Sequence, residues 1–531
     1  MQNKQGPIPI IDLFAGPGGL GEGFSSVLGK NNEPVFKINL SIEKDPVAHK
    51  TLTLRAFYRQ FPKDRAPVEY YEYLRGNIER AELFAAFPKQ AKEAREEARC
   101  MTLGKDDVSS RVGEKLKGRK DWVLIGGPPC QAYSLVGRSR MSGAGARKEG
   151  ESKARYKQRA AAKQSQFQED HRHLLYREYL RIIADHSPAV FVMENVKGIL
   201  SAKLKGEKIF PQITSDLQFP NKALGRKVKS TGYTIHSFVA ESDDLNGGAL
   251  NNTDYLIRSE KYGIPQARHR VILLGIRNDL GVREIGKLQP KPQVSVGEAI
   301  GDLPPLTPGL TREKGLKPVD ALLKLLEADW WLEFENNERT SQLAKFMRKQ
   351  LIGSKGVRHR ESRGGPFVEW HKHALFDWYK DKKLQGVCNH ETRGHIREDL
   401  WRYFFCACFA RKEGRAPHLR DFPEGLLPKH MNVEEAVNGS KFGDRFRVQL
   451  EDEPSTTVVS HISKDGHYYI HYDPRQYRSL TVREAARLQT FPDNYFFEGP
   501  RTQQYHQVGN AVPPLLAAKI AETVRGLLEG E

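Results

Sequence analysis

Short apolar runs alternate with helical patterns through the first half of this chain, and this alternation constrains its fold more than any other feature. The run Val190–Met193 is apolar at consecutive positions, as expected for a parallel strand covered on both faces. Strands that alternate with helices predict a doubly wound α/β sheet, which binds ligands at the carboxyl ends of its strands. The expected strands are Ile8–Phe14, Val35–Glu43, Trp122–Gly127, Ala189–Glu194, Thr234–Ala240 and Arg270–Ile276, and the clearest helices are Pro46–Tyr58 and His171–Asp185.

The alternation stops near Leu303, where three prolines within five residues mark a linker. The stretch to about Glu453 has no steady strand–helix rhythm and contains five of the six tryptophans. Near the C-terminus, the order Thr481-Val482-Arg483-Glu484 is typical of a capping box, and Pro513 and Pro514 are placed to open a last helix. We therefore expect one α/β domain formed by residues 1–303 and 456–531, and a smaller irregular domain at 304–455.

The charge balance favours a polyanionic partner. The chain of 531 residues has 84 Lys and Arg against 66 Asp and Glu, a net charge of +18, and nucleic acid is the first candidate for such a surface. No run approaches the roughly 18 consecutive apolar residues of a membrane span, and the first residues lack a signal-peptide core. Five cysteines are too few for a disulfide scaffold. We expect a monomeric protein of the reducing cytoplasm without membrane contact.

A glycine-rich turn follows the first expected strand. Gly16, Gly18 and Gly21 have the spacing G-x-G-x-x-G, and the acidic Glu43 ends the second strand. Glycines let the backbone approach a ligand, a helix N-terminus attracts an anionic group, and a carboxylate at this place accepts hydrogen bonds from ribose hydroxyls. The pattern suits an adenosine cofactor, whether NAD, FAD or S-adenosylmethionine. A purely structural turn is the alternative.

Reactive side chains stand at the ends of three other strands. Cys130 follows two prolines; a lone cysteine usually only packs, but a basic environment makes its thiolate a nucleophile. Glu194 ends a very apolar strand, where partial desolvation can keep a carboxyl protonated as a donor or acid. Arg268 and Arg270 precede a further strand, and alone they would be interpreted as surface charge. Together, these residue types at one sheet edge indicate a single reactive site.

Two other segments leave alternatives open. Residues 137–163 are rich in Lys and Arg, which fits either a solvated surface insertion or a phosphate-contacting loop, and the position just after Cys130 favours the loop. A set of cysteines and histidines has residue types suited to zinc, but its spacing matches no common zinc pattern and its phenylalanine neighbours indicate buried thiols, so we expect no metal. This set is Cys388, His390, His395, Cys406 and Cys408.

At these residues the chain resembles a cytosine-C5 DNA methyltransferase of bacterial restriction–modification systems. The matching blocks appear in the family's order and bracket nearly the whole chain, and those around Cys130 and Glu194, with the last block, are the most specific. The blocks are Asp12–Gly16, Gly127–Gln131, Glu194–Val196, Gln266–Arg270, Arg483–Gln489 and Gln507–Pro514.

The resemblance implies a Rossmann-like methyltransferase domain that uses S-adenosylmethionine, with a target-recognition domain at 304–455. It implies that the thiolate of Cys130 adds to C6 of a cytosine flipped out of duplex DNA, after which C5 takes the methyl group. Glu194 would engage N3 and the exocyclic amine, Arg268 would hold the O2 oxygen, and Arg270 would brace the site. Protection of DNA beside a cognate restriction endonuclease is the implied role.

The resemblance also assigns binding residues. At Asn77 the family often has an aspartate that accepts the adenine amino group, and Asn77 can still accept through its carbonyl. Thr457 matches a DNA-backbone contact, although a solvent-facing strand threonine explains it equally well. The implied cofactor contacts are Phe14, Gly16, Gly18, Leu20, Glu43, Asn77, Pro128, Asn510 and Val512. The implied DNA contacts are Gln131, Ser134, Arg138, Arg140 and Thr457.

Three other functions would share part of this pattern. An RNA cytosine methyltransferase shares the chemistry, but one short RNA loop would not need a recognition region of about 150 residues. A DNA-binding regulator that has lost activity is disfavoured by the intact Cys130, Glu194 and Arg268. A nicotinamide-dependent oxidoreductase is disfavoured because no histidine partners the cysteine.

Overall fold

The computed structural model describes most of the chain. The described residues are 6–30, 32–129, 152, 171–204, 207–228, 231–240, 250–282, 285–311, 313, 315–354, 364–368, 373–428, 433, 437 and 443–529. The expectations placed on Cys130, Gln131, Ser134, Arg138 and Arg140 therefore lie outside the described residues.

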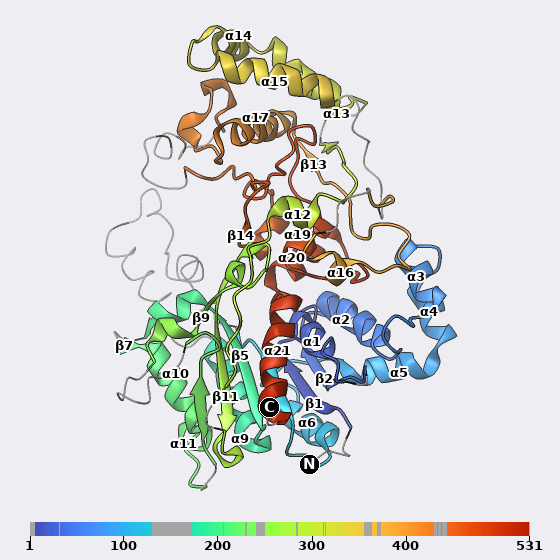
Figure 1. Ribbon diagram of the computed structural model, residues 1–531, viewed down its shortest axis with the longest axis vertical. Helices are drawn as coiled ribbons and strands as arrows, with labels where there is room; N and C mark the ends of the chain where they lie inside the picture. The colour runs from blue at the N-terminus through green and yellow to red at the C-terminus, as the bar shows by residue number, and fades with distance from the viewer. Residues whose placement is uncertain are drawn as a thin grey trace.

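A mixed sheet of eight strands forms the centre of the larger domain (Figure 1). The strand order is β3-β2-β1-β4-β5-β11-β8, and β9 also pairs with β11. Neighbouring strands from β3 to β5 run parallel, whereas β11 is antiparallel to both β5 and β8. The strands are β1 (Ile8–Leu13), β2 (Phe36–Glu43), β3 (Ala98–Cys100), β4 (Val123–Gly126), β5 (Val190–Val196), β8 (Tyr233–His236), β9 (Leu256–Arg258) and β11 (His269–Arg277).

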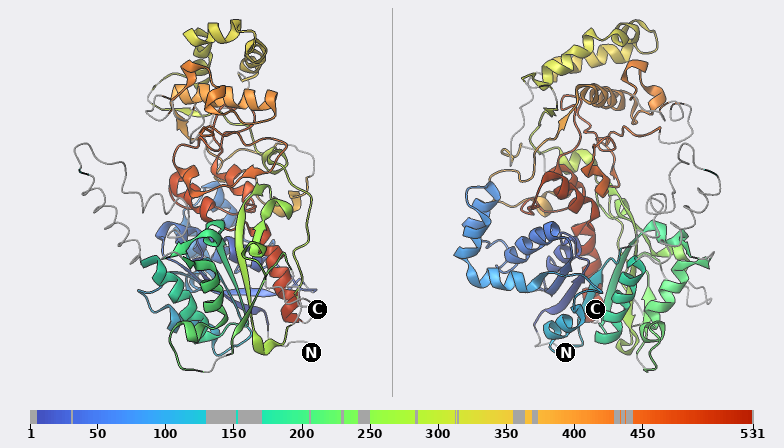
Figure 2. Two further views of the ribbon diagram at one scale, coloured as in Figure 1. Left: turned by 90° about the vertical axis from the view of Figure 1, so that its left-hand side faces the viewer. Right: turned by 180° about the vertical axis from the view of Figure 1, so that it is seen from behind.

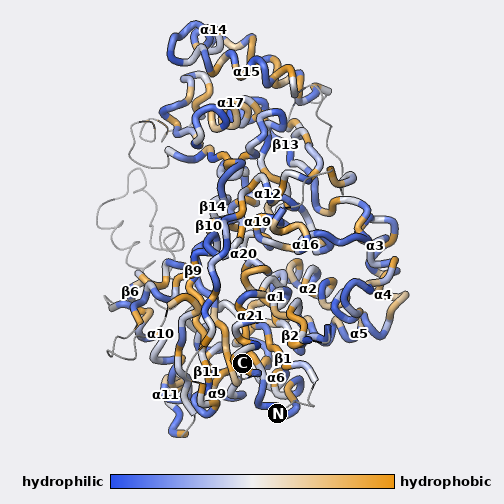
Figure 3. Tube along the Cα trace, viewed as in Figure 1, coloured by the Kyte–Doolittle hydropathy of each residue, from blue (hydrophilic) through white to orange (hydrophobic). Residues whose placement is uncertain are grey.

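Helices cover both faces of this sheet, which confirms the predicted doubly wound α/β fold. Ile11 and Leu13 of β1 pack against α6 (Val108–Leu116), α9 (His171–His186) and α10 (Ile209–Gln218). Ile10 points to the other face, toward α1 (Gly19–Ser25) and α21 (Pro514–Glu529). Figure 3 shows the hydrophobic colouring along β1, β11 and α21 that such double burial requires.

The expected elements form with small shifts of their ends. All six expected strands are present, the one at Thr234 ending at His236 rather than at Ala240, and the two expected helices are α2 (Pro46–Tyr58) and α9. Thr481 and Glu484 make the reciprocal bonds of a capping box at the start of α19 (Val482–Leu488), and Pro514 opens α21. The remaining helices of this part are α3 (Val68–Arg75), α4 (Arg80–Ala86), α5 (Pro88–Glu97), α11 (Pro220–Ala223), α12 (Val296–Ile300) and α20 (Arg501–Asn510).

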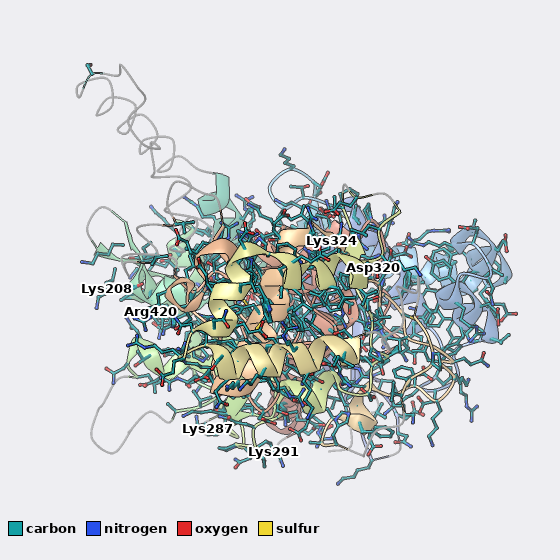
Figure 4. All side chains as sticks on the ribbon, turned by 90° about the horizontal axis from the view of Figure 1, so that it is seen from above. Lys208, Lys287, Lys291, Asp320, Lys324 and Arg420 are labelled. Atoms are coloured by element: carbon teal, nitrogen blue, oxygen red, sulfur yellow. The ribbon has the colours of Figure 1, made fainter. Side chains whose placement is uncertain are left out.

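A second, mainly helical body stands beyond the carboxyl edge of the sheet (Figures 1 and 2). Its core gathers apolar residues such as Trp331 and Phe404 around α17, which is buried along most of its length. Figure 4 views the molecule from this end and labels Asp320 and Lys324 in this body. Its helices are α13 (Pro318–Leu323), α14 (Asp329–Asn336), α15 (Ser341–Ser354) and α17 (Arg397–Glu413), with short strands β12 (Gly309–Leu310) and β13 (Gly394–His395). The short helix α16 (Phe376–Tyr379) lies beside α20 instead, where Trp378 and Tyr379 donate to the carbonyl oxygens of Thr490 and Arg487.

The chain then returns to the sheet through residues 456–529, called the return segment below. Ile470 and Tyr477 still pack in the helical core, whereas α21 packs on α1 so closely that a Cβ on Gly23 would lie 2.4 Å from the Cβ of Ala517. The return segment thus touches both bodies. Within the described part of the chain, no helix is both long and apolar enough to span a bilayer.

A buried histidine ties the linker to the return segment. One ring nitrogen of His390 lies 2.9 Å from the hydroxyl of Thr481, and the other lies 2.8 Å from the carbonyl oxygen of Pro304. Burial lowers the pKa of His390 to about 4, against the opposing charge of Glu484. The imidazole is therefore neutral in the folded chain at neutral pH.

Acidification is expected to destabilise the fold partly through His390. The unfolded chain protonates this group near pH 6.5 and the folded chain only near pH 4, so between these values the unfolded state binds more protons. The stability that the neutral imidazole contributes is complete above about pH 6.5 and is lost as the pH falls toward 4, by at most about 3 kcal/mol. Urea unfolding at a series of pH values measures it. His390→Gln should flatten the slope, whereas the matched change at the exposed His418 should not; equal slopes for His390→Gln and wild type would contradict the prediction.

Candidate active site

The ends of four neighbouring strands form one row along the carboxyl edge of the sheet. Leu13 of β1 pairs with Ile42 of β2 and with Gly126 of β4, and Gly126 pairs with Met193 of β5. The residues that follow these partners along the chain are Glu43, Phe14, Gly127 and Glu194. Strand register therefore brings the glycine-rich turn, the turn before Cys130 and the expected acid to one edge.

The glycine-rich turn is built around backbone conformations that glycine adopts readily. Gly16 has φ 58° and Gly18 has φ 101°, values in the left-handed region. The amide of Gly16 donates to Oε2 of Glu43 at 2.9 Å, and Oε1 of Glu43 accepts the amide of Asp45 at 2.7 Å. A Cβ on Gly16 would meet nothing within 4 Å. The turn therefore presents open space beside a carboxylate, as an adenosine ligand requires.

The C-terminal block closes this turn from one side. A Cβ on Gly19 would lie 2.2 Å from the carbonyl oxygen of Val512, so turn and return segment are in direct contact. Asn510 is exposed, with its side-chain amide 3.1 Å from Nδ1 of His506. Of the expected cofactor residues, Leu20 is buried in the core between the sheet, α1 and α21.

Glu194 reaches across to the turn that leads to Cys130. A Cβ on Gly127 would lie 2.8 Å from Oε2 of Glu194, and Nδ2 of Asn195 donates to the carbonyl oxygen of Pro128 at 3.4 Å. The Glu194 side chain is mostly buried (16% exposed), and its Oε1 lies 2.7 Å from Nε of Arg270. The structure thus brings Glu194, Arg270 and Pro128 together.

Arg268 has different partners from Arg270. Its side chain is almost completely buried (1% exposed), and its guanidinium donates to the carbonyl oxygens of Val458 at 2.8 Å and Gly509 at 3.3 Å. Burial, together with the like charge of Arg270, lowers the pKa of Arg268 well below its ordinary value. The two arginines alternate along the chain, so one binds the return segment while the other faces Glu194.

Gln266 and Thr457 belong to the same junction. β10 (Gln266–Ala267) pairs with β14 (Ser455–Thr456), and Oε1 of Gln266 accepts the amide of Val458 at 2.8 Å. The hydroxyl of Thr457 donates to the carbonyl oxygen of Ala267 at 2.6 Å, and the side chain is half-buried. The Gln266–Arg270 block therefore joins the return segment to the sheet, in addition to supplying Arg270.

A polar pocket adjoins this junction on the side of the helical body. Its volume is about 200 Å³, and its walls offer both hydrogen-bond donors and acceptors. Gln449 is fixed there, because its Oε1 accepts the amide of Thr456 at 2.9 Å. The lining side chains include His418, Asp444, Arg447, Glu453 and Thr456.

Asn77 lies away from the row of strand ends. It follows the C-terminus of α3 and its amide donates to Glu72. β3 lies at the edge of the sheet next to β2, and the acidic residues Asp106 and Asp107 follow it before α6. Asp106 accepts the amide of Thr102 at 2.7 Å, and Asp107 caps α6 by accepting the amide of Ser110 at 3.1 Å.

The cysteines and histidines of the zinc alternative have other surroundings. Cys406 and Cys408 are buried on α17 among apolar side chains, and burial raises the pKa of both thiols. His390 bonds Thr481 and Pro304, as described above. Among the residues described, no group of three or more His, Cys, Asp and Glu side chains is arranged to hold a metal ion.

Comparison with known proteins identifies the class that this fold and site define. A model of the family described as C-5 cytosine-specific DNA methylase matches residues 159–526. The type II methyltransferase M.Bpa9945I of Bacillus paralicheniformis is 34% identical, over 98% of this chain and 99% of that protein. The DNA (cytosine-5-)-methyltransferase M.ApeKI of Aeropyrum pernix is 26% identical, over 82% of this chain and 88% of its own length. A solved structure provisionally described as a DNA modification methyltransferase of an E. coli prophage is 15% identical, covers 98% of this chain and 99% of its own, and has a TM-score of 0.49.

The protein is therefore a methyltransferase of α/β fold. It belongs to the C-5 cytosine-specific DNA methylase family, and it is a DNA (cytosine-5-)-methyltransferase of the restriction–modification type.

Proposed function

We propose that the chain methylates C5 of a cytosine flipped out of a specific duplex DNA sequence, using S-adenosylmethionine and a covalent adduct on Cys130. The observation that carries this proposal is the register that aligns Glu43, Phe14, Gly127 and Glu194 in one row. One end of the row suits the adenosyl group and the other end suits the base. In the sequence, Cys130 comes three positions after Gly127, a member of this row.

The residues present fit the cofactor. Open space over Gly16 leaves room for it, and Glu43 is placed to accept hydrogen bonds from its ribose hydroxyls. Phe14 and Pro128 flank this space along the row, with Gly18 in the turn and Asn510 and Val512 on the return segment. The adenine amino group is assigned to the carboxylates of Asp106 and Asp107, which follow β3, and no longer to Asn77. The bound cofactor supplies an electrophilic methyl group.

On the base side, the thiolate of Cys130 adds to C6 and raises the electron density at C5, which takes the methyl group. Loss of the C5 proton then lets the thiolate leave as the C5–C6 double bond re-forms. Glu194 binds N3 and the exocyclic amine. We assign the O2 oxygen to Arg270, because Arg270 lies against Glu194 whereas Arg268 is bound to two carbonyls of the return segment. The expected roles of the two arginines are thus exchanged.

For DNA, we propose residues 304–455 as the target-recognition domain and the polar pocket beside β14 as part of its base-contacting surface. A pocket with donors and acceptors suits base edges in the major groove. On the segment after Cys130, the proposed DNA contacts are Gln131, Ser134, Arg138 and Arg140. Thr457, whose hydroxyl bonds the carbonyl oxygen of Ala267, is the proposed contact to the DNA backbone. The chain would act as a monomer, alongside a cognate restriction endonuclease that recognises the same site.

Bisulfite sequencing of DNA from cells that express the protein tests this function. Methylated cytosines are expected at one short recurring sequence and nowhere else, because the recognition domain selects the site before the base is flipped. Transfer RNA from the same cells is sequenced in parallel. Methylation found only in the RNA would contradict the proposal. So would unmethylated DNA, if that DNA contains every possible short sequence.

A further inference from the structure

The far side of the glycine-rich turn is held by a residue from the other end of the chain. The hydroxyl of Tyr495, 478 positions downstream, donates to the carbonyl oxygen of Pro17. A Cβ on Gly18 would lie 3.0 Å from this hydroxyl. Tyr495 is completely buried, and it packs directly against the turn at Pro17 and Gly18.

Ionic and aromatic contacts fix Tyr495 in place. The guanidinium of Arg55 on α2 lies 4.9 Å above the Tyr495 ring and 4.0 Å above the ring of Tyr58. Nε of Arg55 donates to Oε2 of Glu22 on α1 at 2.8 Å, and Nη1 donates to Oδ1 of Asn494 at 2.9 Å. One buried arginine therefore links the helix that follows the turn to the residue before Tyr495.

The same stretch of the return segment is tied to the chain that comes from the helical body. Nδ2 of Asn494 donates to Oδ2 of Asp381 at 2.7 Å. Arg483 donates to the carbonyl oxygens of Tyr495 at 2.6 Å and of Cys388 at 2.9 Å. Figure 1 shows α1, α2, α16 and α20 around this place. Tyr495 is thus held on several sides before any ligand is bound.

We propose that Tyr495 is a positioning residue for the cofactor turn, holding Pro17 and Gly18 in the conformation that binds S-adenosylmethionine. Preorganisation of a binding loop strengthens binding because less conformational freedom is lost when the ligand arrives. The inference rests on the proposed function, in that S-adenosylmethionine is taken as the ligand of the turn. Tyr495 would thus lie outside the proposed cofactor pocket and still affect how tightly S-adenosylmethionine binds.

Tyr495→Phe tests this inference. The substitution removes one oxygen and keeps the ring under Arg55, so the fold is retained. Loss of one buried hydrogen bond at the turn should weaken the binding of S-adenosylmethionine and S-adenosylhomocysteine about fivefold to tenfold. The dissociation constants are measured by calorimetry on the full chain without DNA. Amide hydrogen exchange of the residues from Gly18 to Glu22 should be faster in the variant, also without ligand.

Tyr379→Phe is the matched control. Tyr379 is equally buried, and its hydroxyl donates to a backbone carbonyl of the return segment, that of Arg487, at 2.6 Å. We expect a similar fall in melting temperature in both variants, but weaker cofactor binding and faster exchange only in Tyr495→Phe. In Tyr495→Phe, the KM for the cofactor should rise, while kcat at saturating cofactor should stay within about twofold of the wild-type value.

The outcomes separate this inference from the function on which it rests. If the wild-type chain binds neither S-adenosylmethionine nor S-adenosylhomocysteine, the proposed function fails. If the wild type binds them and Tyr495→Phe binds as well as Tyr379→Phe does, the function stands and the positioning role is overturned. Faster exchange in both variants alike would also overturn it.

Discussion

Cys130→Ser is expected to abolish methyl transfer while leaving cofactor binding nearly unchanged. A serine hydroxyl is far less acidic than a thiol and is a much weaker nucleophile at neutral pH, so the adduct at C6 does not form. Without it C5 stays too poor in electrons to take a methyl group, and the rate should fall by more than about a thousandfold. Transfer of labelled methyl groups to DNA measures the rate, and calorimetry measures binding of the cofactor.

Cys100→Ser is a matched control for this prediction. Cys100, at the end of β3, is exposed, and the small buried part of its side chain together with the charge of Glu43 raises the pKa of its thiol. This side chain lies beside the proposed adenosyl end of the row and is a poor nucleophile. DNA with 5-fluorocytosine at the target site should form a denaturation-resistant adduct with wild type and Cys100→Ser, but not with Cys130→Ser. An adduct that survives in Cys130→Ser would overturn the proposed nucleophile.

The sheet could be predicted from sequence because most of its strands are buried on both faces. Val190–Met193 and the strand after Arg270 are continuous apolar runs, and such runs are hard to place elsewhere in a fold. β3 was missed, since Ala98–Cys100 has three residues and no apolar pattern. The insertion of α3, α4 and α5 moves the third strand well downstream of Asn77. The residue expected to contact adenine, Asn77, therefore precedes α4 and α5 in the chain and does not stand at the end of β3.

The site residues could be predicted as a set, whereas their individual orientations could not. Glu194 and the turn before Cys130 share an edge because parallel strands end together, and strand patterns alone indicate this. Which of Arg268 and Arg270 faces Glu194 depends on where the return segment docks. That docking is fixed by contacts such as the one between Arg268 and Gly509, 241 residues apart in the chain. Contacts over such separations leave no local pattern in the sequence.

These contacts also give the motifs of the C-terminal part a physical role. Arg487 is buried between Asp302 and Asp493, at 2.7 Å from each, and Arg478 is paired with Glu484 in the same region. Breaking a buried pair of this kind leaves an uncompensated charge, which is strongly destabilising. The Arg483–Gln489 block therefore holds the return segment in place, and Nε2 of Gln489 donates to the carbonyl oxygen of Val508 at 2.8 Å, next to the Gly509 that Arg268 contacts.

Glu194→Gln is expected to lower the single-turnover methylation rate by about a hundredfold to a thousandfold, the usual effect of removing one transition-state contact. The amide keeps the shape of the side chain but cannot give a proton to N3 as negative charge develops on the ring. It also removes the carboxylate that lies 2.7 Å from Arg270. Some fall in melting temperature is also expected, because the Glu194 side chain is only 16% exposed and Arg270 loses its partner, so the rates are compared well below the melting temperatures of both proteins. Glu260→Gln is the control: Glu260 lies 2.9 Å from His269, between the two arginines in the chain. Equal losses in the two variants would show that charge near this strand matters in general, and would contradict a specific role of Glu194 at the base.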